Sequence, residues 1–209
     1  VPPPLVREGM KAQPAWLHQF LLNPIELRPA VRLRMPRFNM SSDEAAGLAG
    51  YFAAADNMKS PYEQIHERDE TYIAQMESQH PNYLKDGWKL LTLTPDVKAG
   101  VTDKLCASCH TVGNKLAGGA PEERGPNLYL TADRLRSDWL RQWIMAPKRI
   151  LPYTGMPNNF SAQPRYQEQF PGTSVEQIGG VRDALINYHK VQASELVAQP
   201  STQPSTGGN

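Results

Sequence analysis

The sequence Cys106-Ala107-Ser108-Cys109-His110 decides how the chain is interpreted, because it holds the only two cysteines and a histidine follows them directly. Two thiols at this spacing could form a disulfide, a redox pair or half of a zinc site. A redox dithiol needs no histidine there, and a structural zinc ion would require two further ligands of similar type. His18, His66, His80 and His189 show no paired spacing that would supply them. The pattern that fits is Cys-x-x-Cys-His, to which a haem is covalently attached.

The chemistry of attachment explains the form of this motif. Two thiols about one helical turn apart can each add to one of the two vinyl groups of a porphyrin, and the next residue then lies under the iron. We therefore expect one covalently bound haem, with thioether bonds at Cys106 and Cys109 in place of any disulfide. His110 is the predicted iron ligand on one side of the haem.

A second iron ligand is predicted in the segment Tyr153-Thr154-Gly155-Met156-Pro157-Asn158. A methionine thioether is a soft ligand that suits haem iron and raises its reduction potential. A methionine that only fills a core usually belongs to an apolar helical stripe, whereas Met156 lies between a glycine and a proline. Met145 is the poorer candidate, since it falls within a helix expected to begin near Ser137.

An internal repeat is the next most informative feature. The segment 16–24 (Trp-Leu-His-Gln-Phe-Leu-Leu-Asn-Pro) aligns without gaps with the segment 139–147 (Trp-Leu-Arg-Gln-Trp-Ile-Met-Ala-Pro). A Pro-x-Leu element precedes each tryptophan at the same distance. Each segment is followed by a Met-Pro pair and then by a helix with Leu-x-x-Tyr, namely Met35-Pro36 with Leu48 and Tyr51, and Met156-Pro157 with Leu185 and Tyr188. The first copy has no Cys-x-x-Cys-His.

The repeat and the composition divide the chain into four segments. They are a partial unit (residues 1–58), a charged helical connector (59–82), a complete unit (83–192) and a Ser/Thr/Gln/Pro/Gly-rich tail expected to be disordered (193–209). In the connector we expect the helix to begin at Ser60, with Pro61 at its first position and Glu63 completing a capping box. Pro81 should end that helix.

Residues 83–192 resemble a class I cytochrome c. The resemblance rests on a helix with apolar residues 88–91, the motif 106–110, Gly125-Pro126-Asn127-Leu128, a helix over 139–145, Met156-Pro157 and a C-terminal helix from about Val175 to His189. It implies an all-α fold in which the Pro126 carbonyl accepts a hydrogen bond from the free ring nitrogen of His110. It also implies iron ligation by His110 and Met156. The sequence departs from the family in residues 94–96, which separate the first helix from the motif, and in an extra loop over 158–174.

The same resemblance makes Met35 the axial ligand of a haem in the first copy. Three arrangements are compatible with residues 1–58. They could be a vestige that packs on the complete unit, or part of a longer chain that carried another Cys-x-x-Cys-His. They could also complete a second haem held by another haem-bearing subunit. The segment 32–38 keeps the methionine together with clustered arginines that could pair with haem propionates, which favours the last two arrangements.

The predicted function is electron transfer. A haem with both axial positions filled exchanges electrons but binds no substrate. We therefore predict a carrier between a redox-protein donor and acceptor, working as a subunit or domain of a respiratory redox complex, rather than an enzyme. The alternative is a dihaem peroxidase-like or nitrite-reducing enzyme with an open haem. It would require Met156 to be displaced, or a first-copy haem with an acid or base above it, and His18 lies within a helix where it does not suit that role. A haem-based gas sensor would need an output domain that the sequence does not supply.

The composition excludes some partners. The net charge of +1 argues against nucleic-acid binding. No stretch of the chain has the roughly 20 consecutive apolar residues of a membrane helix, and the start at Val1 shows no signal peptide. Because haem is attached to such motifs outside the cytoplasm, the resemblance implies a location in a bacterial periplasm or on the outer face of the inner membrane.

Overall fold

The computed structural model describes residues 5–31, 34–93 and 105–192. Every regular element within these ranges is a helix and none is a strand, so the predicted all-α fold class is confirmed. The residues 94–96 and the tail 193–209 lie outside the described residues. The α-helices are α1 (Glu8–Lys11), α2 (Pro14–Leu22), α3 (Ser42–Ala55), α4 (Glu70–Gln79), α5 (Tyr83–Thr92), α6 (Cys106–Cys109), α7 (Thr131–Arg134), α8 (Ser137–Met145), α9 (Pro147–Ile150) and α10 (Ser174–Ile186), with short 3-10 helices η1 (His66–Arg68), η2 (Pro121–Glu123) and η3 (Leu128–Leu130).

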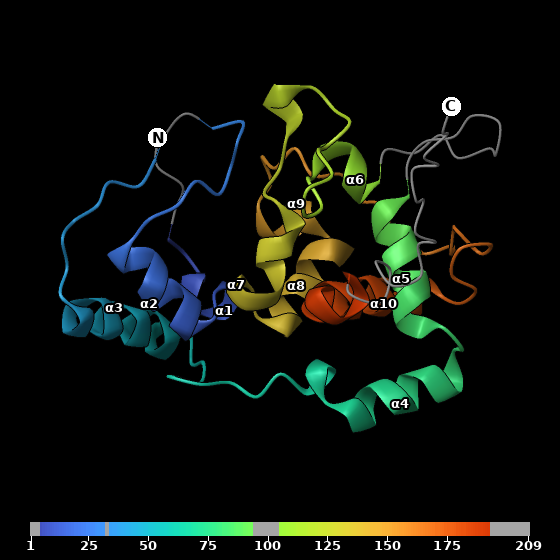
Figure 1. Ribbon diagram of the computed structural model, residues 1–209, viewed down its shortest axis with the longest axis horizontal. Helices are drawn as coiled ribbons and strands as arrows, with labels where there is room; N and C mark the ends of the chain where they lie inside the picture. Colours follow the sequence, from blue (N-terminus) through green and yellow to red (C-terminus); the bar gives the residue numbers. More distant parts are fainter. Residues whose placement is uncertain (1–4, 32–33, 94–104, 193–209) are drawn as a thin grey trace, which may run out of the picture.

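The helices form two units, each with its own hydrophobic core. The first unit, residues 5–58, packs α1 and α2 against α3. The second unit, residues 83–192, packs α5, α7 and α8 against α10. Figure 1 shows the two units side by side, with the connector and α4 running beneath them. The first core takes its residues from 12–52, and the second core also includes Ile65 and Met76 of the connector.

The starts and ends of the helices that form the two cores are set by local sequence signals. α3 begins with a capping box in which Ser41 and Glu44 satisfy each other's backbone N–H, and Thr173 and Glu176 do the same for α10. α8 ends before Pro147, which lacks the N–H that would continue the helix. These starts and ends can be predicted from a few neighbouring residues of the sequence.

The crossing of α5 and α10 depends on two glycines. A Cβ atom on Gly87 would lie 2.2 Å from the carbonyl oxygen of Gly180, and a Cβ atom on Gly180 would lie 2.2 Å from the ring of Phe170. No side chain fits at either position. The close approach buries Leu90 and Leu91 of α5, each contributing about 1.5–3 kcal/mol through removal of apolar surface from water.

The connector differs from its prediction at one end. The helix does not begin at Ser60: residues 59–65 are non-helical, and α4 begins at Glu70. The reason is that Glu63 does not cap a helix. Its carboxylate instead binds the guanidinium of Arg136 at 2.5 Å, and the same guanidinium binds the Lys59 carbonyl at 2.8 Å. The far end agrees with the prediction, because α4 stops at Gln79, before Pro81.

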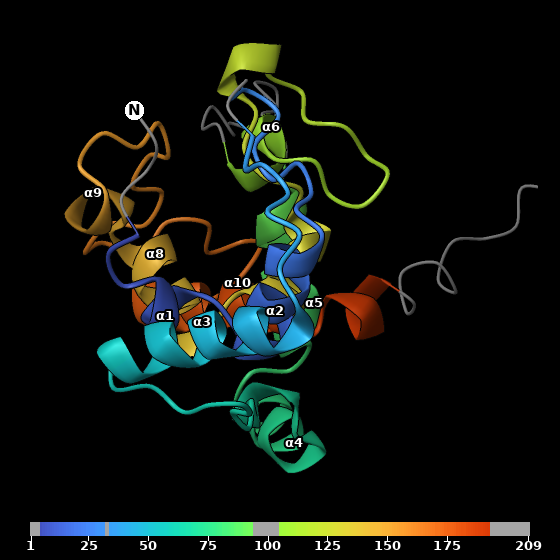
Figure 2. The same ribbon diagram turned by 90° about the vertical axis from the view of Figure 1, so that its left-hand side faces the viewer.

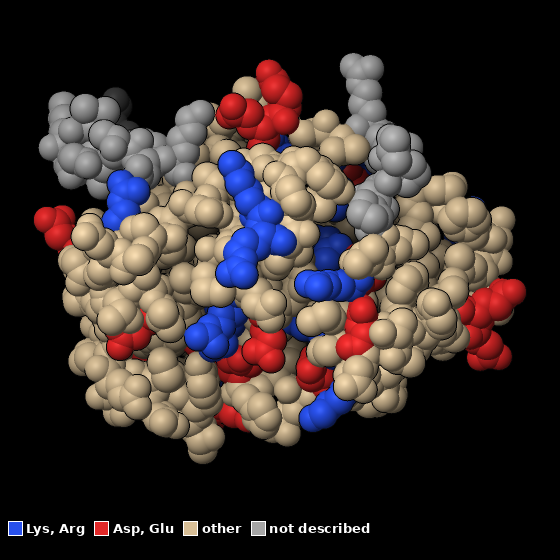
Figure 3. All heavy atoms as spheres, turned by 180° about the vertical axis from the view of Figure 1, so that it is seen from behind, with Lys and Arg blue, Asp and Glu red and all other residues tan. Residues whose placement is uncertain are grey.

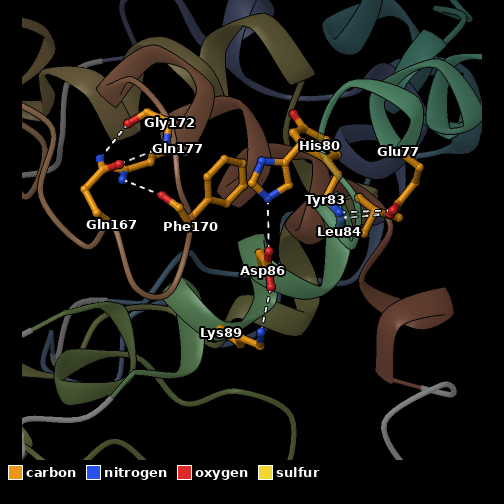
Figure 4. A network of polar contacts seen from close by, with 10 residues as sticks. All are labelled: Glu77, His80, Tyr83, Leu84, Asp86, Lys89, Gln167, Phe170, Gly172 and Gln177. Carbon is orange, nitrogen blue, oxygen red and sulfur yellow. Dashed lines mark hydrogen bonds and ion pairs between the residues drawn. The ribbon is translucent and has the colours of Figure 1, made fainter.

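The end of α4 is joined to α5 by a polar network, shown in Figure 4. The Glu77 carboxylate accepts hydrogen bonds from the backbone N–H groups of Tyr83 and Leu84, at 3.1 and 3.2 Å. It thereby satisfies donors that the first turn of α5 leaves free. His80 stacks on Phe170 with ring centroids 4.2 Å apart, and its Nε2 lies 3.0 Å from Asp86. The network orients α5, and α5 leads toward the cysteine motif.

A buried carboxylate fixes the connector to α10. Asp183 is fully buried and accepts hydrogen bonds from the hydroxyls of Tyr72 and Tyr83, each at 2.8 Å, and from Arg182 at 2.6 Å. Burial and the neighbouring Asp183 raise the pKa of Tyr72 to about 12, so this phenol stays protonated and remains a donor. The three donors compensate the cost of burying the charge of Asp183.

Candidate haem site

The cysteine motif forms one helical turn with the histidine directly after it. α6 spans Cys106–Cys109 and its C-cap is His110, whose backbone N–H bonds back to the Cys106 carbonyl at 2.8 Å. Both cysteines are free thiols at partly exposed positions. One turn of helix is the separation that two vinyl additions require.

The ring of His110 is held from one side by Pro126. Its Nδ1 lies 2.7 Å from the Pro126 carbonyl oxygen, which is the contact that the resemblance implied. A carbonyl oxygen can only accept, so Nδ1 carries the proton and Nε2 keeps its lone pair. The imidazole is thereby oriented with Nε2 available to a metal.

Gly125 makes room for that ring. A Cβ atom at this position would lie 2.3 Å from Cε1 of His110. The backbone N–H of Gly125 also bonds to the Cys109 carbonyl at 2.8 Å, which brings the Gly125-Pro126 segment alongside the motif. The sequence prediction assigned a role to Pro126 but none to Gly125. The role of Gly125 could have been predicted from its position directly before Pro126, because the Pro126 carbonyl must approach the His110 ring closely.

The electrostatics of the site favour neutral groups. Removal from water lowers the pKa of His110, although its bond to Pro126 acts in the opposite direction. The imidazole is therefore uncharged at neutral pH and can act as a ligand. Removal from water likewise raises the pKa of the Cys106 thiol to about 11. A neutral thiol is a poor nucleophile and metal ligand, which does not favour a redox dithiol. No group of three or more His, Cys, Asp or Glu side chains that could hold a metal ion occurs in the ranges that the structure describes.

Met156 belongs to a different part of the second unit. It lies in the loop after α9, is partly buried, and its backbone N–H bonds to the Thr154 hydroxyl at 3.2 Å. Figure 2 shows α6 and α9 standing apart, both on the same side of α10. The structure thus brings Cys106, Cys109, His110 and Pro126 together and places Met156 in a separate loop.

Met35 lies in the first unit. It is partly buried and packs against the core of α2 and α3. Beside that core a hollow of about 230 Å³ is lined by Trp16, Gln19, Phe20, Asn23 and Ile25. Met35 is therefore a feature of the first core, separate from the core that carries His110.

The residues present fit a covalently attached haem. The two thiols have the required separation, the ring of His110 is fixed with one nitrogen available, and the cradle at Gly125 admits no side chain. The buried Nε of Arg124 and Oγ of Ser108 have no partner within the described protein, so this region also offers polar groups that are not used internally. An all-α unit that presents a histidine in this way has the features of a c-type cytochrome domain.

Comparison with protein families agrees with this assignment. The sequence model of the Cytochrome c family matches residues 97–188, a range that contains the motif, Pro126 and Met156. The match therefore supports a c-type cytochrome, a class of protein that binds haem c covalently and transfers electrons through it. No curated protein and no solved structure matches the chain. Among the helices described, none combines the length and the hydropathy needed to cross a bilayer.

Proposed function

We propose that the chain transfers electrons through one haem c attached to Cys106 and Cys109, with His110 and Met156 as the iron ligands. The observation that carries the proposal is the 2.7 Å hydrogen bond between Nδ1 of His110 and the Pro126 carbonyl oxygen. That bond serves no purpose for a dithiol or a surface histidine, but it fixes the tautomer and the orientation of an axial ligand.

Each residue has a defined task. The two thiols anchor the haem, and the iron supplies one-electron chemistry when the haem is bound. Pro126 orients the His110 ring, and Gly125 leaves the space for it. Met156 closes the other axial position and so excludes water and small ligands. The apolar core against which Cys106 and Trp139 pack lowers the local dielectric constant, which, with the thioether ligand, favours a raised reduction potential.

The proposal extends to partners and location. The chain would act as a subunit or domain of a respiratory redox complex, between a protein donor and a protein acceptor, in a bacterial periplasm or on the outer face of the inner membrane. Covalent haem attachment supports this location. Figure 3 shows Lys and Arg side chains gathered near the middle of one face, and Arg141, Lys148 and Arg149 are exposed on α8 and α9. A cationic surface of this kind would orient an acidic redox partner.

The sixth ligand distinguishes this function from the alternative of an open-haem enzyme. We expect the reduced protein to bind no carbon monoxide at neutral pH, because Met156 occupies the iron. The variant Met156→Ala should bind carbon monoxide and have a lower reduction potential. Met145→Ala is the matched control, since Met145 is 45% exposed on α8 and should leave both properties unchanged. Rapid, stoichiometric binding of carbon monoxide by the unaltered protein would contradict the carrier function and favour the peroxidase-like or nitrite-reducing alternative.

A second haem with Met35 as ligand is the finer part of the proposal. It is supported by the Met-Pro pair that both copies share and by the packing of Met35 against the first core. Met35→Ala should leave the spectrum of the haem at Cys106 and Cys109 unchanged. The haem content of the native protein, determined as the pyridine haemochrome beside its intact mass, gives the number of haems per chain.

A further inference from the structure

The two units meet through equivalent positions of the repeat. Trp16 and Trp139 are separated by 123 residues. Ala12 and Leu135, which form an antiparallel backbone bridge between the units, are separated by the same number. A residue of the first unit is therefore paired with its own counterpart in the second.

The backbone and side-chain bonds around this bridge occur twice, with the two units exchanged. The backbone bonds run from Gln13 N to Arg134 O (2.9 Å) and from Arg136 N to Lys11 O (2.9 Å). The side-chain bonds run from Gln13 Nε2 to the carbonyls of Ala132 (2.9 Å) and Leu135 (2.8 Å), and from Arg136 Nε to those of Gly9 (2.7 Å) and Ala12 (3.2 Å). Every donor and acceptor in one set has its counterpart 123 residues away in the other.

The tryptophans follow the same rule. The Lys11 ammonium lies 6.0 Å from the centroid of the Trp139 ring, and the Arg134 guanidinium lies 5.4 Å from that of Trp16. Contacts that repeat with exchanged partners define a local twofold axis at the Ala12–Leu135 bridge. Each unit therefore uses the same set of positions, 123 residues apart in the sequence, to contact the other unit.

The last helices of the two units can be aligned through their capping boxes. Ser41 and Thr173, which are 132 residues apart, cap α3 and α10 in the same way. With this spacing the buried residues also coincide: Ala45, Ala49 and Ala53 of α3 correspond to Gln177, Val181 and Leu185 of α10, all of them buried. The Leu-x-x-Tyr match in the sequence gives a different alignment, so Tyr51 corresponds to Asp183 and not to Tyr188.

The aligned helices differ on their second face. In α10 that face is covered by α5, which contacts Gly180 and hydrogen-bonds Asp183 through Tyr83. The corresponding residues of α3 are Leu48 and Tyr51, which are 37% and 65% exposed. Nothing in the described residues covers this part of α3.

The occupant that fits this face is defined by what α5 does in the second unit. α5 packs on α10 and also contacts α6, the turn that carries the cysteines. A helix that crossed α3 as α5 crosses α10 would bring its own haem-attachment turn over the first unit. The hollow lined by Trp16 and Phe20, whose rings stack at 4.8 Å, and the partly buried Met35 lie on the same core.

We propose that the exposed face of α3 and the hollow beside Trp16 bind a haem-bearing polypeptide, whose helix crosses α3 at Leu48 and Tyr51 and whose c-type haem is ligated by Met35. The inference rests on the proposed function in that it assumes a c-type haem at the homologous place. Figure 2 shows the loop that leaves α2 and the helix α9 both rising above α3 and α10.

A haem peptide tests the site. The probe is a short peptide with one covalent haem on a Cys-x-x-Cys-His sequence, whose iron has a histidine on one side and an open position on the other. It is titrated in the reduced form into the full chain that already carries its own haem. We expect saturable binding at one equivalent, with the added haem acquiring the spectrum of His/Met ligation. The difference spectrum reports only the added haem, because the resident haem is already six-coordinate.

Variants decide whether the proposed residues bind the probe. Met35→Leu keeps the apolar volume and should weaken binding by about tenfold or more, whereas Met145→Leu should leave it unchanged. The spectrum of the resident haem in both variants verifies folding. Binding that does not saturate, or that Met35→Leu leaves intact, would overturn the proposal. Carbon monoxide binding by the resident haem would instead contradict the proposed function, so the two failures are distinct.

A second copy of this chain is the competing occupant of α3. Sedimentation equilibrium of the chain alone, with its haem, should give a monomer. A dimer that Tyr51→Asp converts to monomers would show that α3 pairs with another α3, and the haem-bearing polypeptide would be excluded.

Discussion

α3 and α10 begin alike and differ in what covers them. Both start with a capping box, and both pack one face on a tryptophan-bearing helix, α2 or α8. Beyond that face, nearly all of α10 is buried, whereas α3 exposes Leu48 and Tyr51. The comparison shows that the first face of a helix is set by its own sequence and its nearest neighbour. Whether the second face is buried or exposed depends on whether another segment packs against it.

The largest expected effect comes from the residue that breaks the symmetry between the units. Arg136 is 1% exposed and binds Lys59 and Glu63 of the connector in addition to the carbonyls that match those of its counterpart, Gln13. Arg136→Met should lower the free energy of unfolding by about 3 kcal/mol, since Glu63 and several carbonyls lose their partner. Gln13→Met should cost only about 1–2 kcal/mol. Urea denaturation followed by circular dichroism measures both, and equal losses would contradict the special role of Arg136.

An exchange of residues at the helix crossing tests the alignment of α3 with α10. Gly180→Leu places the α3 residue at the α10 position, where a Cβ atom alone would lie 2.2 Å from the Phe170 ring. The overpacking should cost about 1–3 kcal/mol and loosen α5. The reverse change, Leu48→Gly, should cost about 1 kcal/mol through helix propensity. Thermal unfolding of the two variants ranks them, and a larger loss for Leu48→Gly would mean that α3 is already covered.

The smallest effect is expected at the capping boxes. Hydrogen bonds from Thr173 lower the pKa of Glu176, and those from Ser41 lower the pKa of Glu44. A folded-state pKa below the unfolded value contributes stability that is present above about pH 4.5 and is lost as the pH falls through the folded-state pKa. Glu176→Gln and Glu44→Gln should therefore destabilise slightly at pH 7, with the difference from the unaltered protein vanishing in acid. A difference that grew in acid would mean that the carboxylates are not the capping groups.

The motif, its histidine and the helix ends could be predicted because each follows from a few neighbouring residues. Pro81 ended a helix as expected, and Pro126 was assigned through a dipeptide that stands in the sequence. The prediction of where the connector helix begins was wrong because Glu63 is bound by Arg136, which is 73 residues away. Local capping rules carry no information about such a partner.

In the candidate site, too, the residues of the local motif could be predicted, whereas those that depend on the folded geometry could not. Spacing placed the cysteines and His110 on one turn, but the need for Gly125 appears only when the ring is in position. The Leu-x-x-Tyr match aligned the two helices by residue identity rather than by burial. For that reason it paired Tyr51 with Tyr188. The junction between the units could not be read from sequence, since its bonds are mostly to backbone carbonyls.

The exchange of partners across the Ala12–Leu135 bridge also bears on how a chain with two such units arises. A surface that mates with its own copy is the kind that holds a homodimer together. If the two units descend from one gene by duplication, their ancestor already paired with itself before the copies were fused. Arg136 then records the later event, because, unlike its counterpart Gln13, it also binds Lys59 and Glu63 of the connector, a segment that exists only once the two copies share a chain.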